Sequence, residues 1–322
     1  MGQSISSCTV LTGGIGGAKL VLGLAQIFNA EQLQVIVNTG DDFEHLGLPI
    51  SPDLDTLMYT LAGTVDTKTG WGLAGESWDF MSALEKLKGE SWFRLGDKDL
   101  ATHIRRRQLL SSGLSLSEVT QQLYKAAGVG LQVAPMSDNP VHTRIQTDSQ
   151  LLDFQDYFVR LKAEPVAHAV VYSGAEQATA SPAALSALGD GTDLILIAPS
   201  NPWLSIDPIL SLSDIKATII NTNKPVVGIS PIVAGRAIKG PTAKLMRELG
   251  HEVSALAIAQ HYADILDGII IDTQDIAQRE AIEALGIRVG VSNTLMNTLD
   301  DKTALAEFCL DFAGELTGSA NS

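Results

Sequence analysis

Short apolar runs alternate with amphipathic stretches along most of the chain, and turn residues separate them. The first unit has an apolar run that begins at Cys8, a glycine cluster, a helical pattern over residues 18–28 and a second apolar run over residues 33–37. About 30 residues in this order is the length of a parallel β-α-β crossover. The unit therefore predicts two neighbouring parallel strands joined by a helix.

The same rhythm returns after residue 165. Apolar runs alternate with helical patterns there, the runs at residues 167–172, 193–198, 226–229, 268–271 and 287–291 and the helical patterns at 182–188, 241–249 and 257–266. Buried runs that are bounded by turn residues and alternate with helices are typical of a parallel sheet with helices on both faces. We predict an α/β fold of the Rossmann-like, doubly wound type with a mainly parallel sheet.

The middle of the chain has a different pattern. In residues 63–164 the strand signals thin out, helical patterns take over, and three of the four tryptophans occur. Ser115, followed three positions later by Glu118, is a capping box that predicts the start of an amphipathic helix running to about residue 127. We predict that residues 63–164 form a helical insertion, and that residues 1–62 and 165–322 form the α/β core.

Composition narrows the class of protein. A chain of 322 residues can bury a core that needs no disulfide or structural metal. The net charge of -15 argues against nucleic acid or an anionic membrane as a partner. The two cysteines, Cys8 and Cys309, fit a reducing compartment and give no zinc spacing. With no long apolar run and no secretory signal, we expect a cytoplasmic protein that acts on small molecules.

The glycine cluster lies between the first strand and its helix. Glycine has no Cβ, so the backbone N–H groups of Gly13, Gly14, Gly16 and Gly17 can approach a phosphate at the positive end of that helix. Lys19, in the first helical turn, favours the same ligand. The cluster completes neither the dinucleotide fingerprint nor the Walker A loop. A tight connection without a ligand therefore remains an alternative.

Four aspartates follow within 15 positions. Asp41 and Asp42 come directly after the second strand, and Asp53 and Asp55 follow the helix start at Ser51 and the proline after it. A negative charge suits the first turn of a helix, so local structure alone can account for Asp53. The four charges repel one another, however, unless a cation or hydrogen-bond donors lie among them. The spacing favours a metal or substrate site.

Other loops are expected at the same edge of the sheet. Residues 199–202 and 230–235 follow two later strands, and ligands of parallel sheets bind outside the carboxyl ends of the strands. We expect these loops to meet the glycine and aspartate loops in one crevice. The basic run at residues 103–107 is more typical of a solvated helix face than of a ligand clamp.

Ordered blocks of this sequence resemble the CofD family, the 2-phospho-L-lactate transferases of coenzyme F-420 biosynthesis. The blocks are residues 12–19, 38–42, 51–61, 70–76, 95–103, 198–202 and 230–232. The resemblance covers roughly residues 8–275 and is more specific than any single glycine loop.

The resemblance implies a transferase. A phospho-acid would move from a guanosine-diphosphate adduct, such as lactyl-2-diphospho-5'-guanosine, to the ribityl hydroxyl of the deazaflavin FO. The products would be GMP and F-420-0 or dehydro-F-420-0, and the reaction would use Mg²⁺. The resemblance does not decide whether the acid is phospholactyl, phosphoenolpyruvyl or 3-phosphoglyceryl, and homodimerisation stays open.

The matching positions imply roles for individual residues. Asp41 and Asp53 would be the catalytic residues and the magnesium ligands. Nucleotide binding would fall to Gly13, Gly14, Gly16, Gly17, Lys19, Ser200, Asn201 and Pro202. Acceptor binding would fall to Asp42, Asp55, Trp71, Arg94 and Asp97, with the insertion covering the acceptor. The chain departs from the family at Asp207, where glycine is usual, which leaves the charge and shape of that loop open.

Two other functions remain as alternatives. One is a regulatory protein that binds a nucleotide sugar without chemistry, like the related gluconeogenesis-factor proteins. The other is an NAD-dependent oxidoreductase on a Rossmann-type sheet, which the incomplete fingerprint weakens. Release of GMP from a guanylated adduct in the presence of FO distinguishes the three.

Overall fold

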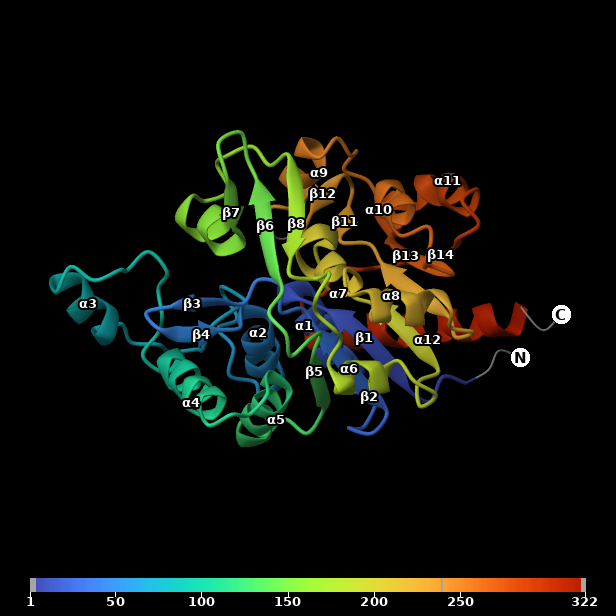
Figure 1. Cartoon of the computed structure of the whole chain (residues 1–322). Coiled ribbons are helices and arrows are strands. Elements are labelled where there is room, and N and C mark those ends of the chain that lie inside the picture. Colours follow the sequence, from blue (N-terminus) through green and yellow to red (C-terminus); the bar gives the residue numbers. More distant parts are fainter. Residues whose placement is uncertain (1–3, 239, 320–322) are drawn as a thin grey trace.

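A single parallel sheet forms the centre of the protein (Figure 1). The computed structural model describes residues 4–238 and 240–319, and within them this sheet has seven strands. Their spatial order is β14 (Arg288–Ser292), β13 (Gly268–Asp272), β10 (Val226–Ile229), β9 (Leu194–Ile197), β1 (Cys8–Thr12), β2 (Leu33–Val37) and β5 (Gln132–Pro135), and every neighbouring pair is parallel. The predicted fold class is therefore confirmed.

Both faces of the sheet are buried. Successive side chains of a strand enter different apolar cores, as Val10 and Leu11 do in β1. One core contains side chains of α1 (Gly14–Leu24), α2 (Pro52–Leu61), α5 (Leu116–Ala126) and α12 (Leu299–Ser319). The other contains side chains of α6 (Pro182–Ala187), α8 (Ser213–Ile220), α9 (Thr242–Glu248), α10 (Ala255–His261) and α11 (Arg279–Glu283). Burial on two faces explains why the strands appear as continuous apolar runs.

Helix α1 begins earlier than the sequence pattern predicted. Its first residue is Gly14 rather than residue 18, and Gly13 is the extended residue before it. The glycine cluster is therefore the first turn of the helix, not a loop that precedes it. Low helix propensity hid this start, because glycine is unfavourable in a helix interior but is accepted in a tight entry such as Gly14, whose φ is 65°.

The segment predicted as a helical insertion contains helices and strands. Its helices are α3 (Asp79–Lys86), α4 (Asp99–Ser111) and α5, and the capping box forms, with Ser115 and Glu118 exchanging hydrogen bonds of 2.8 and 3.2 Å. It also contains β5, which pairs with β2 in the central sheet. Only the last two residues of the short β5 are buried, so no long apolar run marked it. The segment 63–164 thus contributes to the core sheet.

One run predicted for the parallel sheet belongs elsewhere. β8 (Ala169–Ser173) pairs antiparallel with β6 (His142–Gln146), which also pairs with β7 (Leu151–Asp153). No residue of β8 is fully buried, so this strand is only covered in part, unlike the central strands. Smaller elements complete the chain: the hairpins β3 (Phe43–His45)/β4 (Leu48–Ile50) and β11 (Ile232–Val233)/β12 (Arg236–Ala237), η1 (Asp156–Arg160), η2 (Pro202–Ile206), α7 (Asp207–Leu210) and η3 (Thr273–Gln278).

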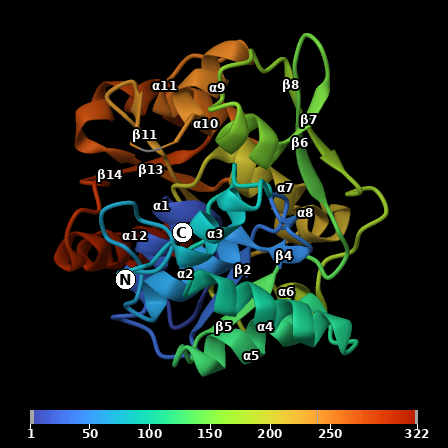
Figure 2. The same ribbon diagram turned by 90° about the vertical axis from the view of Figure 1, so that its left-hand side faces the viewer.

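Figure 1 shows α3 far from the central strands, and in both Figures 1 and 2 the sheet of β6, β7 and β8 lies above those strands. Both cysteines are buried and free. Among the described residues, no helix combines the length and the apolar character that a membrane span requires.

Candidate active site

A cavity of about 560 Å³ opens at the carboxyl ends of β1, β2, β9 and β10. The chain order of the sheet reverses here, because β1 has β2 on one side and β9 on the other. Ligand sites of open parallel sheets lie at such a point. Of the residues singled out from the sequence, Gly13, Gly14, Gly16, Lys19, Asp41, Asp53, Asp55, Trp71, Arg94, Ser200 and Asn201 line the cavity, whereas Gly17, Asp42, Asp97 and Pro202 do not.

Asp41 and Asp53 meet at a shared amide. The side-chain nitrogen of Asn38 donates to Asp41 Oδ1 at 3.1 Å and to Asp53 Oδ2 at 2.9 Å, and it also lies 3.2 Å from the carbonyl oxygen of Leu204. Asn38 is fully buried, and its own carbonyl oxygen accepts from Gly40 at 2.7 Å. Asn38 belongs to one of the sequence blocks but was not predicted as a site residue. Its position between the strand and Asp41 was the only signal.

Burial raises the pKa of both carboxyl groups, and repulsion from neighbouring charges adds to the rise for Asp41. Burial raises the pKa of Asp53 to about 6, although Asn38 and the backbone of Gly14 lower it in part. The pKa of Asp41 rises well above its ordinary range, first because of burial and then because of the nearby charges of Asp53 and Asp42. The pair therefore binds a proton readily near neutral pH. A cation bound by the two carboxylates would also offset their negative charge.

The donor set fits magnesium in part. Mg²⁺ takes oxygen ligands and commonly uses one or two carboxylates together with water and substrate phosphates. Asp41 and Asp53 supply two buried carboxylates on the cavity wall. In residues 4–238 and 240–319 no group of three His, Cys, Asp or Glu side chains is arranged to hold a metal. A bound magnesium ion would therefore need substrate oxygens or water as its remaining ligands.

The glycines allow close contact within the protein as well as with a ligand. A Cβ on Gly16 would lie 2.6 Å from the carbonyl oxygen of Pro199, and one on Gly17 would overlap the hydroxyl of Thr12. One on Gly13 would overlap the carboxylate of Asp53. Three of the four glycines are thus required by packing between loops. A phosphate in the cavity can still reach the start of α1, because Gly13, Gly14 and Gly16 line the cavity.

The other residues assigned to the nucleotide have partners inside the protein. Lys19 donates to the carbonyl oxygen of Met296 at 2.8 Å. Ser200 donates to the carbonyl oxygen of Gly13 at 2.6 Å, which joins the β9 loop to the glycine turn. Asn201 caps η2 by accepting from Leu204 at 3.2 Å. Pro202, which is buried, is the first residue of that turn. These contacts fix the shape of the cavity on the β9 side.

Aromatic side chains also line the cavity. Trp71, Trp92 and Phe93 line it from the inserted segment, and Phe154 and Phe158 line it from the region of η1, their rings stacked 5.4 Å apart. Trp71 is 52% exposed, so its ring has room for a planar ligand. Arg94 lies 4.3 Å from the ring centre of Trp78. Tyr59 lines the cavity as well, and of these six aromatic residues only Trp71 was predicted from the sequence as a site residue.

Two predicted acceptor residues have other contacts. Asp97 is half-buried, accepts from Ser77 at 2.7 Å, and accepts from the backbone N–H groups of Asp79 and Phe80, so it caps α3. Asp42 accepts from Ser51 at 2.7 Å and lines a separate cavity of about 230 Å³. Neither carboxylate reaches the main cavity. Sequence spacing could not distinguish a helix cap from a ligand contact.

Asp207 is tied to neighbouring helices and strands. His261 Nε2 lies 2.9 and 3.0 Å from its two carboxylate oxygens, and the hydroxyl of Tyr172 donates to it at 3.5 Å. Tyr172 also donates to the carbonyl oxygen of Trp203, within η2, at 2.7 Å. The charge at position 207 therefore anchors the end of the η2 turn, and Asp207 does not line the cavity.

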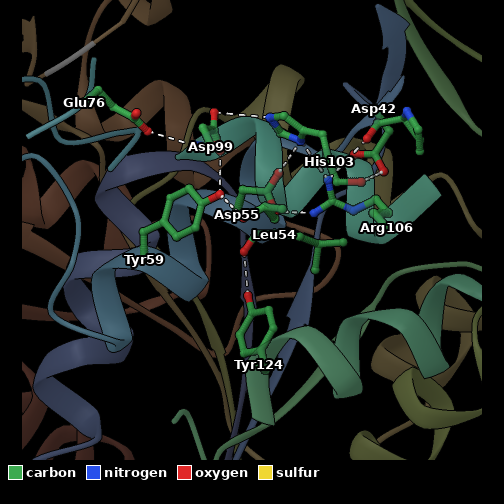
Figure 3. A network of polar contacts seen from close by, with 12 residues as sticks. Asp42, Leu54, Asp55, Tyr59, Glu76, Asp99, His103, Arg106 and Tyr124 are labelled. Atoms are coloured by element: carbon green, nitrogen blue, oxygen red, sulfur yellow. Dashed lines mark hydrogen bonds and ion pairs between the residues drawn. The ribbon is translucent and has the colours of Figure 1, made fainter. Parts of the chain in front are cut away.

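The basic run of α4 is not a solvated face throughout. Arg106 and His103 are almost completely buried, whereas Arg105 and Arg107 are exposed. Figure 3 shows Arg106 of α4 directed at Asp55 of α2, with which it forms an ion pair. The sequence favoured a solvated face because four of five consecutive residues are basic or ionisable. In the structure only His103 and Arg106 face the protein interior, because positions three apart lie on the same side of a helix.

The chain has relatives of known name over nearly its whole length. The model of the family described as 2-phospho-L-lactate transferase CofD matches residues 8–292. A phosphoenolpyruvate transferase of Streptomyces griseus is 42% identical over 313 residues, which cover 95% of this chain and 98% of the relative. A 2-phospho-L-lactate transferase of Methanosarcina mazei is 38% identical over 298 residues, covering 92% and 97%.

Solved structures are similar in fold. A protein of the UPF0052 family from Bacillus halodurans has a TM-score of 0.64 and 16% sequence identity, and the match covers 94% of this chain and 98% of that one. At this identity the likeness concerns the fold alone. The functional comparison rests on the family match and on the two transferases of Streptomyces griseus and Methanosarcina mazei.

Proposed function

The chain belongs to the CofD family of transferases, and we propose that it moves a phospho-acid from a guanosine-diphosphate adduct to the ribityl hydroxyl of the deazaflavin FO in coenzyme F-420 biosynthesis. The acid is a phospholactyl, phosphoenolpyruvyl or 3-phosphoglyceryl group. The observation that supports this reaction most directly is the buried pair of Asp41 and Asp53 beside the start of α1, in one cavity that aromatic side chains also line.

The bond changes are those of a phosphoryl transfer. The ribityl oxygen of FO attacks the phosphorus that carries the acid, a new P–O bond forms, and the bond from that phosphorus to the diphosphate bridging oxygen breaks. GMP leaves with the bridging oxygen. The hydroxyl proton passes to a carboxylate of the Asp41 and Asp53 pair. A carboxyl group with a pKa raised to about 6, as for Asp53, is suited to accept a proton near neutral pH.

Residues of this chain would bind both substrates. The N–H groups at the start of α1 are suited to the phosphates of the nucleotide. Trp71 and Trp92 offer flat apolar surfaces for a tricyclic ring, and polar residues of α2 and α4 line the same cavity. Asp41 and Asp53 would hold magnesium, which when bound offsets the charge of the diphosphate in this strongly acidic protein. Asn38 holds the two carboxylates close to each other by donating a hydrogen bond to each.

The test is a transfer assay with three donors. The purified protein is incubated with FO, MgCl₂ and one guanylated adduct at a time, carrying lactate, phosphoenolpyruvate or 3-phosphoglycerate units, and mass spectrometry follows GMP and the F-420-0 type product. We expect stoichiometric GMP and product with one donor strongly preferred. GMP release that does not depend on FO, or no release with any donor, contradicts the proposal.

A matched variant connects the reaction to the aspartate pair. Asp41→Asn removes one charge at constant size, and we expect turnover to fall by a factor on the order of 10² or more, the usual loss for a general base or a charge-stabilising group. The exposed Asp300 at the start of α12 provides the control, Asp300→Asn, which should keep wild-type turnover.

A further inference from the structure

Two carboxylates from different segments lie on the insertion side of the cavity. Asp55 belongs to α2 of the core, and Asp99 belongs to the first turn of α4 in the inserted segment. Both line the cavity, with side chains 8% and 18% exposed. Asp55 Oδ2 is buried and has no hydrogen-bond partner among the described residues. An unpartnered buried carboxylate oxygen on a cavity wall is suited to a ligand that donates hydrogen bonds.

Arg106 is the buried cation of this wall. It forms the ion pair with the other oxygen of Asp55, approaches His103 Nδ1 at 3.2 Å, and donates to the carbonyl oxygen of Pro49 at 3.3 Å (Figure 3). A guanidinium group can only donate, so His103 Nδ1 must be the acceptor. The other ring nitrogen, Nε2, lies 3.2 Å from Asp99 Oδ2. His103 thus separates the two carboxylates, with Nδ1 3.7 Å from Asp55 Oδ2.

The remaining contacts keep Asp99 charged. Tyr59 donates to Asp99 Oδ1 at 2.5 Å and also contacts the hydroxyl of Thr102 at 2.8 Å. Burial would raise the pKa of Asp99, but its contacts with His103, Tyr59 and Arg106 outweigh burial and lower it. The pKa of Tyr59 is raised by burial and by the charges of Asp55 and Asp99, so the phenol keeps its proton and remains a donor.

Stability alone is a weak reason for such a network. Buried ion pairs are often replaceable by apolar side chains without loss of stability, because the cost of removing the charges from water offsets their attraction. Here the charged side chains of α2 and α4 come together on the cavity wall. Among the described residues, Asp55 Oδ2 has no hydrogen-bond partner. This location indicates a role in holding a ligand rather than in folding.

We propose that Arg106 and His103 are positioning residues, which hold the carboxylates of Asp55 and Asp99 as hydrogen-bond acceptors on either side of the imidazole so that core and insertion together bind the donor groups of the acceptor substrate. This inference rests on the proposed function, in which that substrate is FO. Arg106 acts through Asp55 and His103, and His103 acts through Asp99. The nucleotide end of the cavity, at the glycine turn and the β9 loop, is independent of them.

Comparing the binding of FO with the binding of GMP separates a positioning role of Arg106 from general damage to the fold. Calorimetry measures the Kd of FO and the Kd of GMP for the wild type, for Arg106→Met and for Arg107→Met. The control residue, Arg107, is the next one on α4. It is exposed and forms a surface ion pair with Glu44 at 3.3 Å. We expect Arg106→Met to raise the Kd of FO about tenfold or more, the size of one lost hydrogen bond to a charged group, and to leave the Kd of GMP within about twofold. Arg107→Met should change neither.

The outcomes distinguish this inference from the proposed function. An unchanged Kd of FO in Arg106→Met, or an equal loss for GMP, overturns the positioning role even when the wild type transfers normally. Absence of GMP release by a wild type that binds FO in the expected way overturns the reaction but not the positioning role. A wild type that does not bind FO overturns both.

A double-mutant cycle covers the case in which Arg106→Met is unstable. Thermal melting is compared for Arg106→Met, Asp55→Asn and the double variant. Removing the arginine alone leaves a buried unpaired carboxylate, so we expect that single change to lower the melting temperature by several degrees, and Asp55→Asn to restore part of the loss in the double variant. Additive shifts would show that the two residues are not coupled and would overturn the proposed mechanism.

Discussion

Replacing Asp53 by asparagine should make the metal-free protein relatively more stable at high pH while it lowers turnover. Asp53 is 7% exposed, and burial raises its pKa to about 6, compared with about 3.9 in an unfolded chain. The folded state therefore binds this proton more tightly than the unfolded state does. The stability that this proton provides is present at low pH and is lost as the pH rises from the unfolded value through the folded one.

The magnitude follows from the size of the shift. A rise of about 2 pKa units corresponds to about 3 kcal/mol of lost stability above pH 7, and roughly half of that falls between pH 5 and pH 8. The asparagine side chain of the variant carries no charge, so this loss is absent there. The amide forms one hydrogen bond fewer than the carboxylate, which costs about 1 kcal/mol but does not vary with pH. The repulsion between Asp41 and Asp53 adds to the effect with the same sign.

Urea unfolding in EDTA at pH 5, 6, 7 and 8 measures the effect. We expect the free energy of unfolding of Asp53→Asn, relative to the wild type, to increase by about 1.5 kcal/mol between pH 5 and pH 8. Asp300→Asn, an exposed control, should parallel the wild type. Turnover of Asp53→Asn should fall by a factor on the order of 10² or more. Parallel curves for Asp53→Asn and the wild type would refute the reasoning that burial and repulsion strain the aspartate pair.

Three further outcomes are expected. Gly16→Val should lower the melting temperature by several degrees, because a Cβ there would lie 2.6 Å from the carbonyl oxygen of Pro199; a variant that melts like the wild type and only loses GMP affinity would instead identify a pure phosphate-approach glycine. FO should quench tryptophan fluorescence, and Trp71→Phe should remove part of the quenching; full quenching in that variant contradicts contact between FO and this ring. Asp207→Asn should lower stability by about 1 kcal/mol, because the ion pair with His261 is only partly buried; thermal melting at pH 6 is the measurement, and an unchanged midpoint means that the pair is dispensable.

Part of this protein was predictable from local sequence. Strands buried on both faces must be apolar at successive positions, so the runs at β1, β2, β9, β10, β13 and β14 marked the parallel sheet. The place of the cavity followed from the same reasoning, because loops at the carboxyl ends of parallel strands share one edge. The capping box at Ser115 was equally local, since it depends on residues three positions apart.

Tertiary structure decided the rest, because strand pairing, burial and ionisation depend on residues that are distant in sequence. The runs of β5 and β8 could not reveal which strand each would pair with. Asp97 and Asp55 are both aspartates beside a helix start, yet the half-buried Asp97 caps α3 and the buried Asp55 pairs with Arg106, 51 positions away. The burial of that arginine comes from α4 packing against β4 and α5, which no local pattern contains. The sequence by itself thus determined the sheet and the edge where the site lies, and only the packed structure determined which charges are removed from water there and which partners they have.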